Sequence, residues 1–268
     1  MAKIRKIETA SNSASTYTGG ITIKSGQELD AMRRAGAVVG QVIDALKLAV
    51  EPGITTRELD QVALHEIVRL GGKPTFKGYR GFPGCICTSV NEEIVHGIPG
   101  KRMLKEGDIL KLDVGATVDG FIGDAAVSVG VGQISQQTSE LIDATRGSLE
   151  AGIKAAQPGN RIGDIASAVQ RYSESHGYSV VREFVGHGVG RFLHEDPQVP
   201  NYGEPGRGAL LRPGMCIAIE PMLNVGGWRT LLLDDQWTVV TADKSLSAHF
   251  EHTIAITESG PEVLTVHN

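Results

Sequence analysis

The N-terminal third of the chain contains two patterns of apolar and polar residues that are typical of amphipathic helices. Over residues 26–49, apolar side chains recur three and four positions apart, and Ser25 and Glu28 form a capping box in front of them. A second capping box begins at Thr55 and leads into another helical pattern, which Gly71 ends. These patterns predict two consecutive helices.

The same order of patterns returns in the second half of the chain. A helix is predicted over about 136–156, a Pro-Gly turn follows at Gly159, and a second helical pattern covers residues 162–176. When Gly53 in the first Pro-Gly turn is superposed on Gly159, apolar positions of the following helices coincide. We interpret this as a two-copy duplication.

The duplication predicts the fold class. Each copy consists of two helices followed by strands, so we expect an α+β fold in which helices cover one face of a curved antiparallel sheet. Residues 21–268 are expected to form one domain of two duplicated halves, about 25–130 and 131–258. The stretch before them is rich in Ser, Thr, Asn and Gly, and residues 1–20 are expected to form a flexible N-terminal arm.

A predicted hairpin in the first half brings two carboxylates together. Alternating residues predict strands on either side of Asp119-Gly120, a two-residue turn sequence. In this hairpin Asp113 faces Ala126, and Asp124 is the diagonal neighbour of Asp113 on the same face, roughly 7–8 Å away. Carboxylates this close raise each other's pKa unless a cation lies between them, so a metal ion is their natural partner. An isolated pair of this kind, however, more often consists of two exposed surface aspartates.

Three further residues strengthen the hypothesis of a metal site. Glu220 ends the strand that is equivalent to the one ending at Asp113, inside an apolar stretch where an unpaired carboxylate would be unfavourable. Glu251 lies in a strand predicted over residues 249–256, on the face opposite its apolar residues. His187 lies between glycines that allow a ligand to approach closely.

Composition excludes several classes of protein. The 268 residues carry a net charge of −5, which argues against a protein that binds nucleic acid by neutralising phosphates. No uncharged apolar run reaches about 18 residues, so no membrane span is predicted, and no secretory signal is recognised. The three cysteines, Cys85, Cys87 and Cys216, cannot form a disulfide framework and are expected to be reduced thiols in strands. There is no serine nucleophile elbow, phosphate-binding loop or complete H-E-x-x-H zinc motif.

Taken together, these motifs resemble the type I methionine aminopeptidases. The resemblance covers residues from about Ile23 to Glu258 and is carried by Asp113 and Asp124, Gly186-His187-Gly188-Val189-Gly190, Ile219-Glu220-Pro221 and Phe250-Glu251-His252-Thr253. It implies the pita-bread fold, in which two pseudo-symmetric halves surround a metal site. It also implies two divalent ions, Co, Mn, Fe or Zn, bound by Asp113, Asp124, His187, Glu220 and Glu251, with Asp124 and Glu251 bridging.

The same resemblance implies an activity. The protein would be a dinuclear metal-dependent methionyl aminopeptidase that removes the N-terminal methionine from nascent proteins and peptides, preferably before a small uncharged second residue. A metal-bridging hydroxide would be the nucleophile, and Glu220 would transfer its proton to the leaving amine. His96 and His194 would contact the substrate at the reacting peptide bond. The methionine pocket would be lined by Tyr79, Phe82 and Trp237.

The resemblance also implies partners and a location. The partners would be polypeptides that begin with Met, reached through a transient ribosome association, and we expect a cytoplasmic monomer without membrane or specific nucleic-acid contacts. Phe76 and Leu193 stand where the family often has a cysteine and an aromatic residue, which makes the shape of the pocket less typical than the metal ligands.

Two alternative hypotheses keep the fold. An Xaa-Pro aminopeptidase or prolidase would use the same ligands on another substrate, but those relatives usually carry a further N-terminal domain, for which we expect no room before Ser25. A pita-bread binding module without metals would be a non-enzyme. The presence of all five ligand residues argues against it.

Overall fold

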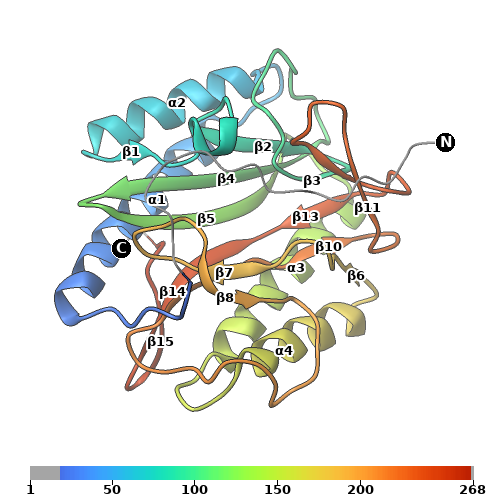
Figure 1. Ribbon diagram of the computed structural model, residues 1–268. Helices are drawn as coiled ribbons and strands as arrows, with labels where there is room; N and C mark the ends of the chain where they lie inside the picture. The colour runs from blue at the N-terminus through green and yellow to red at the C-terminus, as the bar shows by residue number, and fades with distance from the viewer. Residues whose placement is uncertain (1–18, 267–268) are drawn as a thin grey trace.

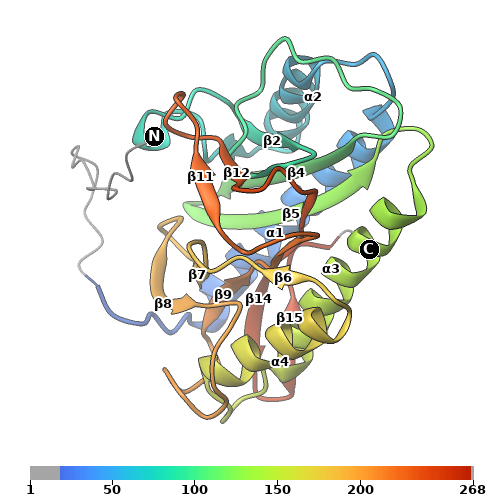
Figure 2. The ribbon, with the colours of Figure 1, turned by 90° about the vertical axis from the view of Figure 1, so that its right-hand side faces the viewer.

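Four α-helices lie against one face of a curved sheet in the computed structural model, which describes residues 19–266 (Figure 1, Figure 2). The helices are α1 (Gly26–Ala49), α2 (Thr56–Arg69), α3 (Gln136–Ala155) and α4 (Ile162–Ser175). Both predicted capping boxes are present, at Ser25 and Thr55, which confirms why the first two helices begin where they do. Most of the predicted N-terminal arm, residues 1–18, lies outside the described residues.

The main sheet is antiparallel throughout and has nine strands within residues 19–266. Its main path is β1-β4-β5-β14-β9-β7-β8, with β2 paired to β4 and β15 paired to β14. The bounds are β1 (Lys73–Pro74), β2 (Ile86–Val90), β4 (Ile109–Val118), β5 (Phe121–Gly130), β7 (Gly186–Gly188), β8 (Glu195–Val199), β9 (Cys216–Ile219), β14 (Glu251–Thr257) and β15 (Gly260–Val263).

Two small sheets extend this layer. One has the order β13-β10-β6 and the other β11-β12-β3. Their bounds are β3 (Glu93–Val95), β6 (Ser179–Val180), β10 (Met222–Asn224), β11 (Thr230–Leu232), β12 (Val239–Thr241) and β13 (Ser247–His249), and a short 3₁₀ turn covers Tyr79–Gly81. The α+β prediction, with helices segregated on one face, is therefore confirmed.

The helix-covered face holds the main hydrophobic core. Leu112 and Val114 of β4 are fully buried there, together with apolar residues of α1. Gly123 of β5 allows α1 to approach closely, because an added Cβ atom would lie 2.8 Å from the backbone of Ala35. Since residues alternate between faces, Asp113 and Asp124 point to the opposite, open face, which Figure 1 views from the front.

The predicted strand over residues 249–256 is wrong in one respect. The chain forms two strands here, and Phe250 lies between them. β13 pairs with β10, whereas β14 pairs with β5 and β9, so the chain passes from a small sheet into the main sheet at this point. The N–H of Phe250 donates to the carbonyl of Pro221 instead of continuing either ladder.

Two further expectations concerned reduced cysteines in strands and the absence of a membrane span. All three thiols are free and buried, but Cys85 lies in a bend just before β2 and not in a strand. Among residues 19–266, no helix combines the length and the apolar character that crossing a membrane requires.

Candidate metal centre

The hairpin β4–β5 has the register that its turn sequence predicts. Asp113 is paired with Ala126, and Gly115 with Asp124, across the two strands. On the other side of β5, Ala126 is paired with Glu251, the first residue of β14. Asp113 and Glu251 therefore flank the small side chain of Ala126 in one row, and Asp124 lies beside that row on the same face.

His187 and Glu220 complete the group from the second half of the chain. His187 is the central residue of β7, and Glu220 follows directly after β9. The Nε2 atom of His187 lies 3.8 Å from Oδ2 of Asp124 and 3.7 Å from Oε1 of Glu220. Ligand atoms of Asp124, His187 and Glu251 all lie within 4.8 Å of one another. Residues from five separate segments thus converge at one point.

Burial controls the protonation of this group. Burial raises the pKa of Asp113 to about 7, and it raises the pKa values of the other three carboxyl groups well above their usual range. Repulsion from the neighbouring acids raises the pKa values of Asp124, Glu220 and Glu251 further. Burial also lowers the pKa of His187 to about 4, which keeps its imidazole neutral and able to bind a metal. Four ionised carboxylates can coexist here only with cations among them.

Buried oxygen atoms without partners test whether a metal fits this site. Oδ1 of Asp113, Oδ1 of Asp124 and Oε1 of Glu251 are buried and have no hydrogen-bond partner within the described part of the chain. Such atoms are unfavourable unless something satisfies them. Carboxylates combined with one imidazole suit divalent Mn, Fe, Co or Zn. The residues therefore fit divalent cations both in their geometry and in their chemistry.

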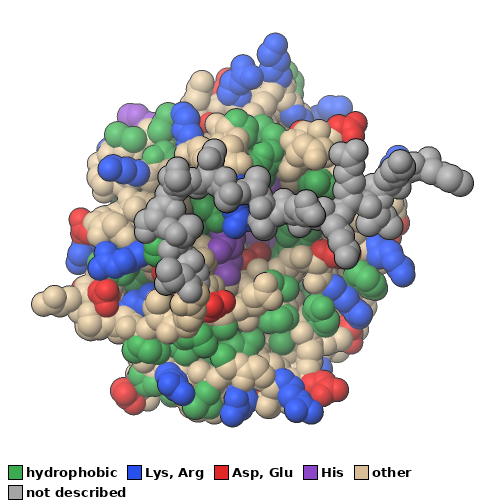
Figure 3. Space-filling model, viewed as in Figure 1, with side chains coloured by type: hydrophobic (Ala, Val, Ile, Leu, Met, Phe, Trp, Pro, Cys, Tyr) green, Lys and Arg blue, Asp and Glu red, His purple; other side chains and the backbone are tan. Residues whose placement is uncertain are grey.

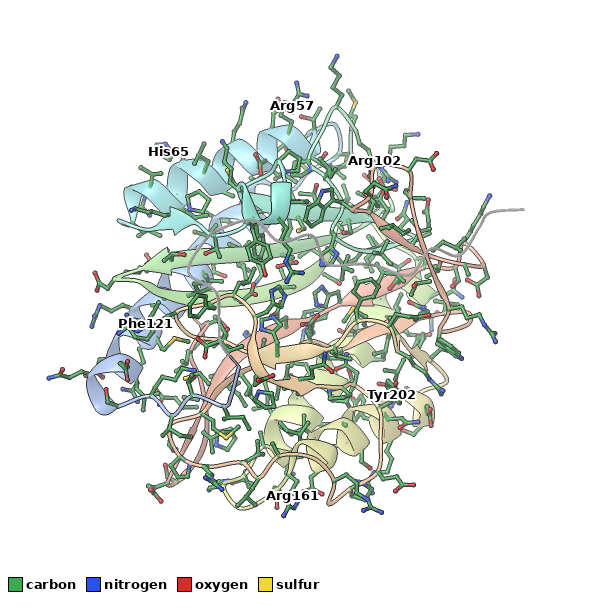
Figure 4. All side chains as sticks on the ribbon, viewed as in Figure 1. Arg57, His65, Arg102, Phe121, Arg161 and Tyr202 are labelled. Atoms are coloured by element: carbon green, nitrogen blue, oxygen red, sulfur yellow. The ribbon has the colours of Figure 1, made fainter. Side chains whose placement is uncertain are left out.

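The five candidate metal ligands line a cavity of about 270 Å³. All ten residues predicted for the site line this cavity, namely Asp113, Asp124, His187, Glu220, Glu251, His96, His194, Tyr79, Phe82 and Trp237. Figure 3 looks onto the open face of the sheet and shows histidine side chains near its centre. By contrast, His65 of the incomplete H-E-x-x-H motif lies exposed on α2, far from the middle of the fold (Figure 4).

The imidazole of His194 has a fixed partner at the edge of the cavity. Its Nδ1 atom lies 2.8 Å from the hydroxyl of Tyr79, and its ring centroid is 4.3 Å from that of His187. Burial lowers the pKa of His194 to about 2, so the ring is neutral. The next residue, Glu195, accepts hydrogen bonds from backbone N–H groups of the preceding turn and forms a buried ion pair with Lys24 at 2.9 Å. These contacts hold the turn that carries His194.

His96 also lines the cavity, in an aromatic environment. Its backbone adopts a left-handed conformation with φ of 61°, and its ring meets those of Phe184 and Trp237 edge-on, at 5.6 Å and 6.4 Å between centroids. Burial lowers its pKa to about 4. Trp237 also packs edge-to-face on Phe82 at 5.0 Å. The aromatic residues therefore form one apolar wall, with a neutral imidazole at its border.

Sequence reasoning missed several residues that line the cavity, including Arg80, Cys87, Phe184 and Val185. Cys87 was expected to be only a structural thiol, but it is paired with Asp113 across β2 and β4, and it lines the cavity beside that carboxylate. Pairing the strand expected around Cys87 with the hairpin would have identified it. Another omission is His249, whose Nε2 lies 4.0 Å from Oε2 of Glu220.

Comparison with known proteins agrees with this geometry. The family model described as metallopeptidase family M24 matches residues 30–258. The chain is similar to methionine aminopeptidase 1 of Bacillus subtilis, with 53% identity over 245 residues, which is 91% of this chain and 99% of that protein. It is 52% identical over 246 residues to the methionine aminopeptidase of Clostridium perfringens, covering 92% and 99% of the two chains. The crystal structure of methionine aminopeptidase from Thermotoga maritima superposes with a TM-score of 0.91 at 48% identity, covering 92% of this chain and 100% of that one.

Proposed function

The chain belongs to metallopeptidase family M24, and from this premise we propose that its metal centre removes N-terminal methionine from proteins and peptides. The observation that carries the proposal is that the ten site residues expected from the sequence line a single cavity. A metal-dependent aminopeptidase needs cations, an apolar specificity pocket and neutral hydrogen-bond donors around one peptide bond. The cavity supplies a candidate for each.

Five residues would hold the cations. Asp113, Asp124, His187, Glu220 and Glu251 are the proposed ligands of two divalent ions, and Asp124 and Glu251 are proposed to bridge them. This assignment is supported by the closeness of Asp124 to Glu251 and by their unpartnered oxygen atoms. When bound, divalent ions polarise a carbonyl group and lower the pKa of water, which supplies a nucleophile at neutral pH.

The apolar wall would select methionine. Phe82 and Trp237 form an edge-to-face pair, and Tyr79 and Phe76 lie on the same side of the cavity. Phe76 packs on Gly115, because any side chain at that position would overlap the aromatic ring. An unbranched thioether adapts well to such a pocket and makes favourable contacts with aromatic rings. Leu193 also lines the cavity, at a position where the family often has an aromatic residue.

Glu220 and the two neutral histidines would carry out the proton transfers and stabilise developing charge. The hydroxyl of Tyr79 contacts Nδ1 of His194 at 2.8 Å. In the tautomer in which that hydroxyl donates, the ring proton is on Nε2, and Nε2–H would donate to the substrate carbonyl oxygen. His96, which also lines the cavity, would donate to the peptide nitrogen. Glu220 would accept the proton of the attacking water and deliver it to the leaving amine.

The substrate class suggests a cellular setting. Nascent polypeptides that begin with Met would be the partners, preferably with a small uncharged second residue, because the reacting bond would lie in the cavity beside the buried carboxylates. We expect a cytoplasmic monomer that associates transiently with ribosomes. The net charge of −5 is consistent with no sequence-specific nucleic-acid contact.

A peptide assay distinguishes this proposal from its alternatives. Met-Ala-Ser and Ala-Pro-Ala are incubated with the protein and added Mn²⁺ or Co²⁺, and released amino acids are measured. We expect cleavage of Met-Ala-Ser only. Cleavage of Ala-Pro-Ala alone would indicate an Xaa-Pro aminopeptidase. Inactivity on both peptides with every metal would instead support a binding module.

A further inference from the structure

A buried histidine that the mechanism above does not use lies behind Glu220. His249 is the last residue of β13 and is only 2% exposed. Its backbone N–H donates to the hydroxyl of Ser128 at 2.9 Å, and the same hydroxyl donates to its carbonyl at 2.8 Å. These two bonds hold the backbone of His249 against β5. The orientation of the imidazole is therefore set by the sheet.

The imidazole itself has no hydrogen bond within residues 19–266. Both Nδ1 and Nε2 are buried and unpartnered there. A buried imidazole without a partner is unfavourable compared with an apolar side chain of similar size, so packing alone does not explain a histidine at this position. A carboxylate oxygen of Glu220, Oε2, lies 4.0 Å from Nε2.

Glu220 lies between two imidazoles. Its Oε1 atom faces Nε2 of His187 at 3.7 Å, on the side of the metal ligands. Its Oε2 atom faces Nε2 of His249, on the side away from them. A neutral imidazole carries one N–H, which can reach Oε2 through a small rotation of the carboxylate or through one bridging water.

We propose that His249 is a positioning residue that donates from Nε2 to Oε2 of Glu220 and so directs Oε1 toward the cations. The proposal rests on the proposed function, because it takes Glu220 as a metal ligand and proton carrier. A carboxylate that is held by an outer hydrogen bond presents its other oxygen in one orientation. Loss of such a bond typically weakens metal binding by about 10–100-fold.

Metal affinity tests this role with a readout other than activity. Wild type, His249→Phe and His249→Gln proteins, prepared without metal, are titrated with Mn²⁺ by calorimetry and by the paramagnetic resonance signal of free Mn²⁺. We expect His249→Phe to bind Mn²⁺ about 10–100-fold more weakly at one site. His249→Gln keeps an N–H donor and is expected to remain within about threefold of wild type. On Met-Ala-Ser, kcat should fall in His249→Phe while KM changes little.

His252 provides a matched control next to another ligand. It follows Glu251 directly but points to the other face of β14, where Nδ1 contacts the hydroxyl of Thr265 at 2.8 Å. His252→Phe should therefore lower the unfolding temperature without changing Mn²⁺ affinity. His249→Phe should do the opposite, because it replaces an unpartnered imidazole by an apolar ring.

Several outcomes would overturn the proposal. If His249→Phe binds Mn²⁺ within twofold of wild type, or if His249→Gln is as weak as His249→Phe, the imidazole does not position Glu220 through a hydrogen bond. A lower unfolding temperature of metal-free His249→Phe would assign the residue to packing. Failure of the wild type to bind Mn²⁺, Co²⁺, Fe²⁺ or Zn²⁺ would overturn the proposed function together with this inference, whereas equal affinities overturn the inference alone.

Discussion

On the face of the β4–β5 hairpin that α1 covers, Leu112 and Val114 are fully buried in the main hydrophobic core. On the opposite face of the same strands, Asp113 and Asp124 face a cavity and are surrounded by further acids. Adjacent residues of one strand thus serve opposite purposes. Burial of the apolar face stabilises the fold. The buried carboxylates of the acidic face lower the stability of the metal-free protein, but they provide the oxygen atoms that cations can bind.

The largest effect is expected from substitutions on the acidic face. Asp113→Ala or Glu251→Ala should abolish metal-dependent turnover, a loss of about a thousandfold or more, because a cation loses a ligand. The metal-free protein should remain folded, since each change removes a buried carboxylate that has an unpartnered oxygen atom. Peptide kinetics, metal content and circular dichroism check both parts. Full activity in either variant would refute the assigned site.

On the apolar face, the neighbouring residue should show the reverse pattern. Leu112→Ala leaves a cavity beneath α1 and should lower the free energy of unfolding by about 3 kcal/mol. Turnover per folded molecule should stay close to that of wild type, because the alternation of the strand keeps Leu112 away from the cavity. Denaturant titration measures the first effect and Met-Ala-Ser hydrolysis the second. A large loss of Mn²⁺ affinity in Leu112→Ala would show that the two faces are not independent.

A smaller effect is expected when the contact between Tyr79 and His194 is removed, because this contact orients the histidine and does not bind the cations. Tyr79→Phe removes the hydroxyl that contacts Nδ1 of His194, so both tautomers of the neutral ring become populated. We expect kcat to fall about tenfold, which corresponds to about 1.4 kcal/mol, with little change in KM. Nitrogen chemical shifts of His194 report the tautomer directly. Phe82→Leu is the matched control, because it should change KM for methionyl peptides and leave those shifts unaltered.

The contrast between the faces also explains what could be predicted from the sequence. The Asp119-Gly120 turn and strict alternation determine the hairpin register, so the placement of Asp113 opposite Ala126 follows from local residues alone and is confirmed. Capping boxes determine the starts of α1 and α2 in the same local way. The α+β fold then follows from the order of helices and strands.

The missed features depend on contacts between distant segments. Phe250 interrupts the predicted strand because β13 and β14 join different sheets, and neither partner can be read from residues 249–256. Cys87 enters the cavity only because β2 pairs with β4. His249 is two residues from Glu251, yet its imidazole faces Glu220, which follows β9. None of these pairings leaves a local pattern in the sequence.

The smallest expected effect lies at the start of α1, the helix that covers the apolar face. In the capping box of α1, the Ser25 side chain accepts from the N–H of Glu28, whose carboxylate accepts from the N–H of Ser25 at 3.0 Å. Ser25→Ala should lower the free energy of unfolding by about 1 kcal/mol without changing Mn²⁺ affinity.

Because the backbone and hydroxyl of Ser25 lower the pKa of Glu28 in the folded protein, the ionised box stabilises the fold above the usual pKa of a glutamate. This contribution should disappear as the pH falls through the lowered value, so the difference in stability between wild type and Ser25→Ala should shrink in acid. Thr55→Ala, at the equivalent cap of α2, should behave in the same way. A change in Mn²⁺ affinity in either variant would mean that helix packing reaches the acidic face through the sheet.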